Sequence, residues 1–425
     1  MGIDDLLVDN LDEFRKKCLK RERRTTIAYF GLDLIIDKKG KIHCIEINGK
    51  HSGTAGEFGE KIRKKFVSYL ASFGVPVEIF QNDLYYETPG HEDGWAKEFG
   101  VRGTNITSFQ LECSKRAMGN DSMSNEEYFS RKRKMKPEVL ERLNSRYRKY
   151  FFQRTKEVLV AKPEMGIYDI REAKGIIWDN NHISRIIDEN NYLSVNPFII
   201  EWLTEDKLAQ AQMVHFIPTY YNKSLEDIPK NKHLHAYIKN KKVNKVVLKP
   251  VKGKCGTGVI VLEKKDLGNK FSSLLENPEK YLDDERSKVI TELKYSGEVI
   301  VNPLIESKPF YSPLTGKNHR SCIRYLVAVH SENGNIHPYP LGGFSRLSAE
   351  PISDCLYSYV ANMAKGAHSA SIEKSDEKRI VKWVDSFIKT FYRRALRLDV
   401  DAGPIVNAVW AFDKPEIYKM PWIWY

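Results

Sequence analysis

Two apolar, β-branched runs in the middle of the chain flank a loop with three glycines, and a lysine stands at the end of the first run. The runs are residues 246–248 and 259–262, the lysine is Lys249, and the glycines are Gly253, Gly256 and Gly258. Glycine lets backbone N–H groups approach an anion closely, so such a loop can wrap around a phosphate. Because side chains alternate along a strand, Lys249 shares a face with Val247 and projects beside the loop. The Gly-Lys-Ser/Thr ending of a Walker P-loop is absent, which leaves a phosphate-covering hairpin or an ordinary glycine-rich turn.

Oxygen-bearing side chains mark a second segment, near the N-terminus. Residues 27–37, a Lys-Lys-Gly turn and residues 42–48 predict a β-hairpin. Asp33 lies on its first strand, and Glu46 and Asn48 share one face of its second strand. Two carboxylates and an amide oxygen on adjacent strands suit Mg²⁺, which takes few protein ligands together with substrate phosphates. The alternative is a surface hairpin whose outer face is simply polar.

Further polar residues follow on segments that read as strands later in the chain. A predicted strand at 299–305 ends in Glu306, where a nucleotide base can meet backbone groups and an acid can meet a ribose. Arg324 lies on a predicted strand at 319–329, and Arg346 follows a Gly-Gly-Phe-Ser segment. Arginine can hold phosphate or carboxylate groups through two parallel hydrogen bonds. Each residue alone is typical of a protein surface, but their order favours an anion site.

The elements that must position these residues alternate between helices and strands. A helix at 60–73 leads through a short link into a strand at 75–80, which indicates an α/β segment. A helix is predicted after Asn196-Pro197, and a long helix covers 376–397. Two further elements are expected near the ends of the sequence: an amphipathic helix at 3–20, and a closing hairpin from 406–413 and 421–425.

Composition bounds the class of protein. With 425 residues, 41% hydrophobic and 29% charged, the chain should form two or three soluble globular domains. No apolar run approaches the roughly 20 residues that span a bilayer, and no signal peptide is recognisable, so we expect a cytoplasmic protein without a membrane partner. The six cysteines are scattered without a Cys-x-x-Cys pair, which argues for reduced thiols and against zinc.

The net charge of +12 suits either nucleic acid or an anionic nucleotide. A strongly basic helical stretch is predicted at 131–149, broken by Pro137 and followed or interleaved by Tyr147, Tyr150 and Phe151. A solvated helix face is the preferred interpretation of this stretch, and contact with RNA is the alternative. We therefore expect no nucleic-acid partner.

The order of these motifs resembles the ATP-grasp superfamily, and within it the RimK-like carboxylate–amine ligases. Lys207, in Asp-Lys-Leu, looks like the family's first nucleotide lysine, and Lys249 with its glycines looks like the second lysine and the hairpin over the phosphates. Residues 301–305 are similar to the hinge that cups adenine. Arg324, Arg346 and the Ala-Asn-Met-Ala-Lys-Gly-Ala segment resemble the residues near phosphates and acceptor. The resemblance covers about 195–425.

One element departs from the family pattern. These enzymes end in a hairpin with a metal-binding Asp followed by Glu-x-Asn, whereas here Asp413 is followed by no such motif. The hairpin at 27–48 looks like the missing element. Three arrangements follow: the hairpin completes the site in a permuted order, it ends a preceding ATP-grasp unit, or the C-terminal unit has lost its metal and serves as a nucleotide-binding scaffold.

The resemblance implies an α+β ATP-grasp fold, in which two lobes grip ATP, with a preceding α/β domain. We expect the helix and metal hairpin at 1–58, the α/β domain at 59–195, and the lobes at 196–425 with a hinge near 300–306. The implied reaction is attack of a carboxylate on the γ-phosphate of ATP, followed by displacement of phosphate from the acylphosphate by an amine. The implied substrates are amino acids or peptides.

The resemblance also assigns residues to roles. It implies ATP on Lys207, Lys249, Gly253, Gly256, Gly258, Leu304 and Glu306, Mg²⁺ on Asp33, Glu46 and Asn48, and catalytic roles for Arg324, Arg346 and Asn362. Because a fold does not fix a function, two alternatives stay open. One is a kinase that phosphorylates a hydroxyl group, and the other is an inactive module that binds nucleotides or nucleic acid.

Overall fold

The computed structural model describes eight ranges of the chain. These are 24–49, 56–81, 102–105, 115–135, 139, 170–179, 193–211 and 217–398, with short gaps at 121, 174, 198–199, 201–202, 205–206, 208–209, 242, 252–257, 269, 354, 360 and 362–365. The helix expected at 3–20 and the hairpin expected at 406–425 lie outside the described residues. So do Gly253, Gly256 and Asn362.

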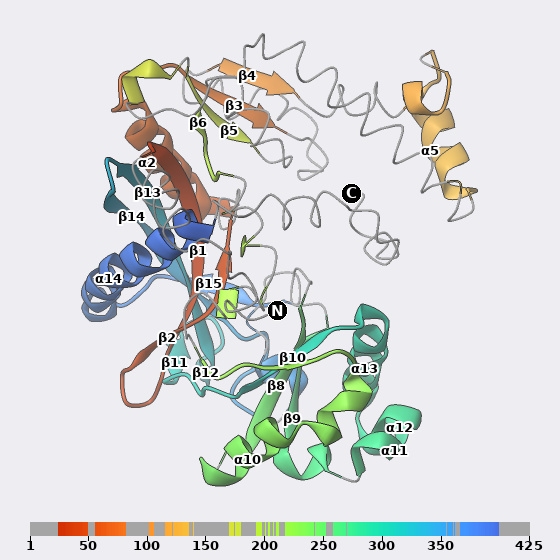
Figure 1. The fold of residues 1–425 in the computed structure, drawn as a ribbon. Helices are drawn as coiled ribbons and strands as arrows, with labels where there is room; N and C mark the ends of the chain where they lie inside the picture. The colour runs from red at the N-terminus through yellow and green to blue at the C-terminus, as the bar shows by residue number, and fades with distance from the viewer. Residues whose placement is uncertain are drawn as a thin grey trace, which may run out of the picture.

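An antiparallel sheet of five strands forms the centre of the described structure (Figure 1). Its strands, in spatial order, are β15 (His368–Ala370), β14 (Asn335–Leu347), β13 (Ser321–Glu332), β1 (Thr26–Ile36) and β2 (Ile42–Asn48). Asp33 on β1 lies directly opposite Arg324 on β13 and Glu46 on β2. The predicted hairpin is therefore present, and it pairs within one sheet with strands from far along the chain.

Helix α14 (Lys374–Leu398) covers one face of this central sheet (Figure 1). Its buried residues recur at helical spacing, as the amphipathic pattern at 376–397 predicts: Ile380, Val384, Ile388, Phe391 and Ala395. They pack on every second residue of β1, namely Ala28, Phe30, Leu32, Leu34 and Ile36. Helix α2 (Gly56–Ala71) packs at one end of the opposite face, against Tyr29 and Phe344 among others.

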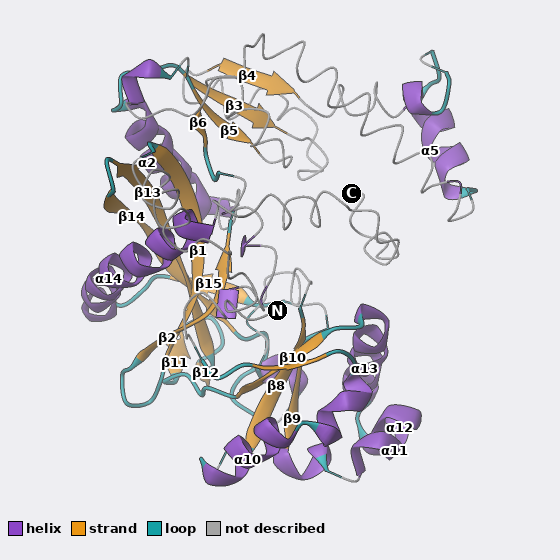
Figure 2. Cartoon of the chain, in the orientation of Figure 1, coloured by secondary structure: helices purple, strands orange, loops and turns teal. Residues whose placement is uncertain are grey.

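A second sheet lies beyond the central one and has its own core. It consists of β7 (Tyr220–Asn222), β10 (Val299–Pro303), β8 (Lys245–Pro250) and β9 (Ile260–Glu263), all antiparallel neighbours. Helices gather around it (Figure 2): η4 (Leu225–Lys230), α10 (Lys232–Asn240), η5 (Lys264–Leu267), α11 (Lys270–Glu276), α12 (Pro278–Tyr281) and α13 (Asp284–Ser296). Strands β8 and β9 form the hairpin predicted on either side of the glycine loop.

A third sheet is parallel, as the α/β alternation after residue 60 predicts. Its strands are β4 (Arg102–Asn105), β3 (Val77–Gln81), β5 (Ile176–Asp179) and β6 (Leu193–Ser194). Just after β6, Val195 forms a parallel bridge with Ile27, which joins this sheet to β1. The combination of antiparallel and parallel sheets with covering helices gives the α+β class expected from the sequence.

The described structure also contains α5 (Asn125–Arg133), η3 (Ile170–Glu172), η6 (Leu356–Ser358) and a ribbon of β11 (Phe310–Ser312) with β12 (Lys317–His319). Residues 200, 203–204, 207 and 210–211 are helical as well. Within the described part of the chain, no helix has both the length and the apolar content to cross a bilayer.

Candidate functional site

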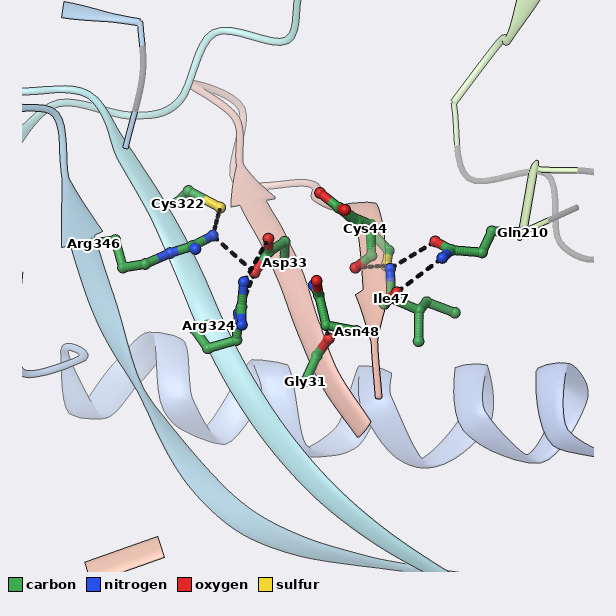
Figure 3. A network of polar contacts seen from close by, with 10 residues as sticks. Gly31, Asp33, Cys44, Ile47, Asn48, Gln210, Cys322, Arg324 and Arg346 are labelled. Carbon is green, nitrogen blue, oxygen red and sulfur yellow. Dashed lines mark hydrogen bonds and ion pairs between the residues drawn. The ribbon is translucent and has the colours of Figure 1, made fainter. Parts of the chain in front are cut away.

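Asp33 is held by two arginines on the face of the central sheet that α2 covers only at one end (Figure 3). Arg324 donates from Nε to Oδ1 at 2.5 Å and from Nη2 to Oδ2 at 3.0 Å, and Arg346 Nη2 lies 2.8 Å from Oδ1. Burial by itself raises the pKa of Asp33, but the two guanidinium charges outweigh it and lower the pKa to about 2. Asp33 is thus a carboxylate at any ordinary pH.

Arg346 has donors beyond those that Asp33 uses. Its Nη2 also donates to Cys322 Sγ at 3.3 Å, while its Nε is buried and has no hydrogen-bond partner among the described residues. Burial raises the pKa of the Cys322 thiol, so the group beside Arg346 is neutral. A buried N–H without an acceptor is costly, and this one therefore suggests that a ligand oxygen belongs there.

Two lysines from other elements approach the same carboxylates. Lys249 leaves β8 on the side opposite the core residues Val246 and Leu248, as strand alternation predicts, and is only 8% exposed. Lys207 Nζ lies 3.4 Å from Glu46 Oε1. Burial lowers the pKa of Lys249 and Lys207 lowers it further, while Glu46 and Asp33 oppose the change. Lys249 therefore lies within electrostatic reach of Lys207 and of both carboxylates.

A β-bulge in the hairpin sets the direction of the acidic side chains. Asp33 pairs with Glu46 but the next residue, Leu34, pairs with Cys44, so that Ile45 is extra on β2. Bulges of this kind bend a strand and redirect side chains, often beside functional sites. Glu46 and Asn48 keep the shared face that the sequence predicts, and Asn48 Nδ2 donates to the Gly31 carbonyl at 3.4 Å.

The chemistry of these donors fits a hard divalent cation. Asp33, Glu46 and Asn48 supply two carboxylates and an amide oxygen on one side of adjacent strands. Among the contacts of the described residues, Asp33 Oδ2 accepts from Arg324 alone, and Glu46 is held only at the 3.4 Å distance to Lys207. Oxygen lone pairs thus remain for a cation. No cluster of three or more His, Cys, Asp or Glu side chains suited to a metal occurs in the described part of the chain.

Glu306, Leu304 and Gly258, which are also assigned from the sequence, make other contacts in the structure. Glu306 is half-exposed and forms an ion pair with Lys38, whose hydrogen bond lowers the pKa of the Glu306 carboxyl. The backbone N–H of Leu304 donates to the Lys245 carbonyl at 3.0 Å. Gly258 has a φ of +68°, and a Cβ there would lie 3.3 Å from Pro250 and Leu293. Glycine is therefore required where the loop rejoins β9.

Gln210 is a site residue that the sequence motifs miss. Its side chain accepts from the Ile47 N–H and donates to the Ile47 carbonyl, both at 2.8 Å, on the free edge of β2 (Figure 3). Its spacing of three residues from Lys207 places both side chains on one face of a helix. That spacing is the only signal in the sequence that points to Gln210.

No protein-family model matches the chain, and no curated protein matches it. Among solved structures, the chain aligns with D-alanyl-alanine synthetase A from Vibrio cholerae at 10% identity and a TM-score of 0.29, over 51% of this chain and 59% of that one. A glutathione synthetase-like effector from Globodera pallida aligns at 9% identity and a TM-score of 0.31, over 79% and 78%. A RimK domain ATP-grasp protein from Sphaerobacter thermophilus aligns at 12% and 0.22, over 56% and 86%.

Among these neighbours, the Sphaerobacter thermophilus protein is described as an ATP-grasp protein. The alignment with the first of them spans less than two thirds of its length. With TM-scores of 0.22 to 0.31, the alignments carry no argument about the reaction of this chain. Its own side chains must supply that argument.

Proposed function

We propose that the chain is an ATP-dependent carboxylate–amine ligase of the ATP-grasp kind, acting through an acylphosphate. The observation that supports this most is a cluster of charges: in the described site, four cations gather around two carboxylates. The cations are Lys207, Lys249, Arg324 and Arg346, and the carboxylates are Asp33 and Glu46. A cluster of cations attracts an anionic ligand, and a polyphosphate is one.

The nucleotide lies between the two sheets in this proposal. Lys207 and Lys249 hold its phosphates from two elements, and the loop with Gly253, Gly256 and Gly258 closes over them. The hinge at Leu304 meets the adenine, and Glu306, in exchange for its present contact with Lys38, meets the ribose. Catalysis then consists mainly of positioning and of charge neutralisation on the transferred phosphoryl group.

The two arginines and Asn362 act on the acyl side. Arg324 is fixed by a two-point contact with Asp33, so its guanidinium plane is oriented before any ligand binds. Arg346 offers its unpaired Nε to an oxygen of the carboxylate or acylphosphate. Donors that are already oriented stabilise developing charge without reorganisation.

Asp33, Glu46 and Asn48 are the residues that would hold Mg²⁺. When bound, the ion supplies further positive charge to the phosphate oxygens of the nucleotide. The ion pairs of Asp33 with the arginines would link its position to theirs, and Glu46 would exchange its contact with Lys207 for the cation.

Calorimetric binding of Mg·ADP tests the nucleotide site. Lys249→Met should weaken the affinity at least about tenfold, because a buried phosphate contact is lost. Lys389→Met removes an exposed lysine on α14, paired with Asp385, and should leave the affinity unchanged. Equal affinity of Lys249→Met and the parent protein would remove Lys249 from the site.

A phosphate-release screen with Mg·ATP across amino acids and small peptides tests the reaction class. Mass analysis should find an amide product whose formation needs both an acid and an amine. A phosphorylated alcohol would instead identify a kinase. Nucleotide binding without any turnover across the screen would indicate a binding module.

A further inference from the structure

Gln210 makes an unusual contact for a side chain, because it behaves like one residue of an additional strand. Both of its amide groups engage the backbone of a single residue, Ile47, at 2.8 Å. Gln210 is only 2% exposed, so neither hydrogen bond competes with water. The contact joins residues that are 163 positions apart in the sequence.

The same helix face carries Lys207. Residues 200, 203, 207 and 210 are helical and recur at intervals of three and four, which places them in one stripe. Ile200 and Leu203 lie in the core under the central sheet, whereas Lys207 reaches Glu46 and Gln210 reaches Ile47. The described helical residues of this stripe therefore include both the cation and the residue whose contact holds the acidic strand.

Gln210 holds β2 at residues 46–48, where the strand has the least support from other strands. Strand β2 is at the edge of the sheet, so β1 is its only strand partner among the described strands. Its ladder is interrupted by the bulge at Ile45, immediately before Glu46. Glu46 and Asn48 flank Ile47, and their side chains point to the site on the face opposite Ile47. Fixing both backbone groups of Ile47 fixes the two neighbours.

We propose that Gln210 is a positioning residue, which holds Glu46 and Asn48 at a set distance from Lys207 so that nucleotide phosphates and their cation bind together. This rests on the proposed function, since it assigns Gln210 to the same site. The purely structural alternative is that Gln210 only covers a strand edge against unwanted pairing. The two differ in whether loss of the contact changes ligand affinity in protein that stays folded.

Gln210→Leu and Gln210→Glu separate these possibilities through calorimetric affinity for Mg·ADP. Gln210→Leu removes both hydrogen bonds and should weaken binding about tenfold at a temperature well below unfolding. Thr26→Val is the matched control, because it also removes two side-chain hydrogen bonds on β1, to Ser331 and Tyr392, away from the site. It should bind Mg·ADP like the parent protein.

Gln210→Glu adds a measurement that would not change if Gln210 only covered the edge of the strand. A carboxylate there can accept from the Ile47 N–H but faces the Ile47 carbonyl, so burial and repulsion raise its pKa. Glu46 nearby raises it further and Lys207 opposes this. The protonated form restores both hydrogen bonds. The ratio of the variant's Kd to the parent's should therefore be near one at low pH and rise about tenfold as pH increases.

Two results would overturn the proposal, and they are distinguishable. If the parent binds Mg·ADP but both Gln210 variants bind it equally well at every pH, Gln210 is an edge cover only. If the parent itself does not bind Mg·ADP, the proposed function fails and the positioning role fails with it. Should Gln210→Leu not fold, the isosteric Gln210→Glu series still decides.

Discussion

The two faces of the central sheet use the same strands for different purposes. On one face, β1 presents Ala28, Phe30, Leu32, Leu34 and Ile36, which are all apolar and all buried under α14. On the other face it presents Ile27, Tyr29, Gly31 and Asp33, which change from apolar to charged along the strand. Strand β13 does the same from Ala328 through Leu326 to Arg324. Alternation thus lets one strand contribute both to stability and to the site, without sharing residues between them.

Truncation on the apolar face should give the largest loss of stability. Phe391 is fully buried, and its ring meets the Phe30 ring at a centroid distance of 5.6 Å. Phe391→Ala should lower the free energy of unfolding by about 3–5 kcal/mol, because it leaves a cavity in the core. Urea unfolding measures this. The Mg·ADP affinity of the folded variant should stay within about twofold of the parent, and a larger change would show that the two faces are coupled.

Asp33→Asn should cost about 3 kcal/mol, since it leaves two buried guanidinium groups without their counter-charge. The pKa of Asp33 is lowered to about 2, below its unfolded value of about 3.9. Its contribution is therefore present above pH about 4 and is lost as pH falls toward 2.

Unfolding curves across this pH range should thus show the parent and Asp33→Asn converging in acid. Asp385→Asn, which removes an exposed carboxylate paired with Lys389 on α14, provides the control and should change stability by no more than about 0.5 kcal/mol. A constant gap between the parent and Asp33→Asn from pH 5 to pH 2 would contradict the ion-pair account.

The smallest effect concerns His330, which lies at the opposite end of β13 from Arg324. Its Nε2 is buried and has no hydrogen-bond partner in the part of the chain that the structure describes, and its ring packs on Phe73 and His337. Burial lowers the pKa of His330, which Glu332 opposes and His337 reinforces. Because the folded pKa lies below the unfolded value of about 6.5, this residue's contribution is full above that pH and is lost as pH falls.

His330→Phe should flatten the loss of stability between pH 7 and pH 5 and leave Mg·ADP affinity unchanged. Thermal unfolding at each pH measures the slope. A slope equal to that of the parent would assign the acid sensitivity to other groups.

The sequence predicts the parts of this site that depend on local alternation. Strand periodicity predicts which side of its strand each of these side chains occupies. In the structure, Lys249 points away from the apolar core residues of β8, and Glu46 and Asn48 share one face of β2. The helix at 374–398 follows from its stripe of apolar residues. These features depend on neighbours within a few residues, so a short window of sequence contains the cause.

Other features depend on contacts across the whole chain. The sequence motif assigns Asp33 to a cation. Nothing near Asp33 in the sequence indicates that Arg324, 291 residues later, holds both of its carboxylate oxygens. The bulge at Ile45 follows from pairing with β1 and leaves no mark in the pattern of 42–48. Gln210 acts on the backbone of Ile47, and a backbone partner has no side-chain signature at all.

The pairing of β1 with β13 also has a consequence for biosynthesis. Thr26–Ile36 and Ser321–Glu332 are direct partners, so the hairpin leaves the ribosome roughly 270 residues before its neighbour exists. At about 5–20 residues per second, that interval is on the order of 15–60 s. During it the apolar side chains of β1 have no native cover from α14 or β13, and such non-local pairing is slow to form even once both are present.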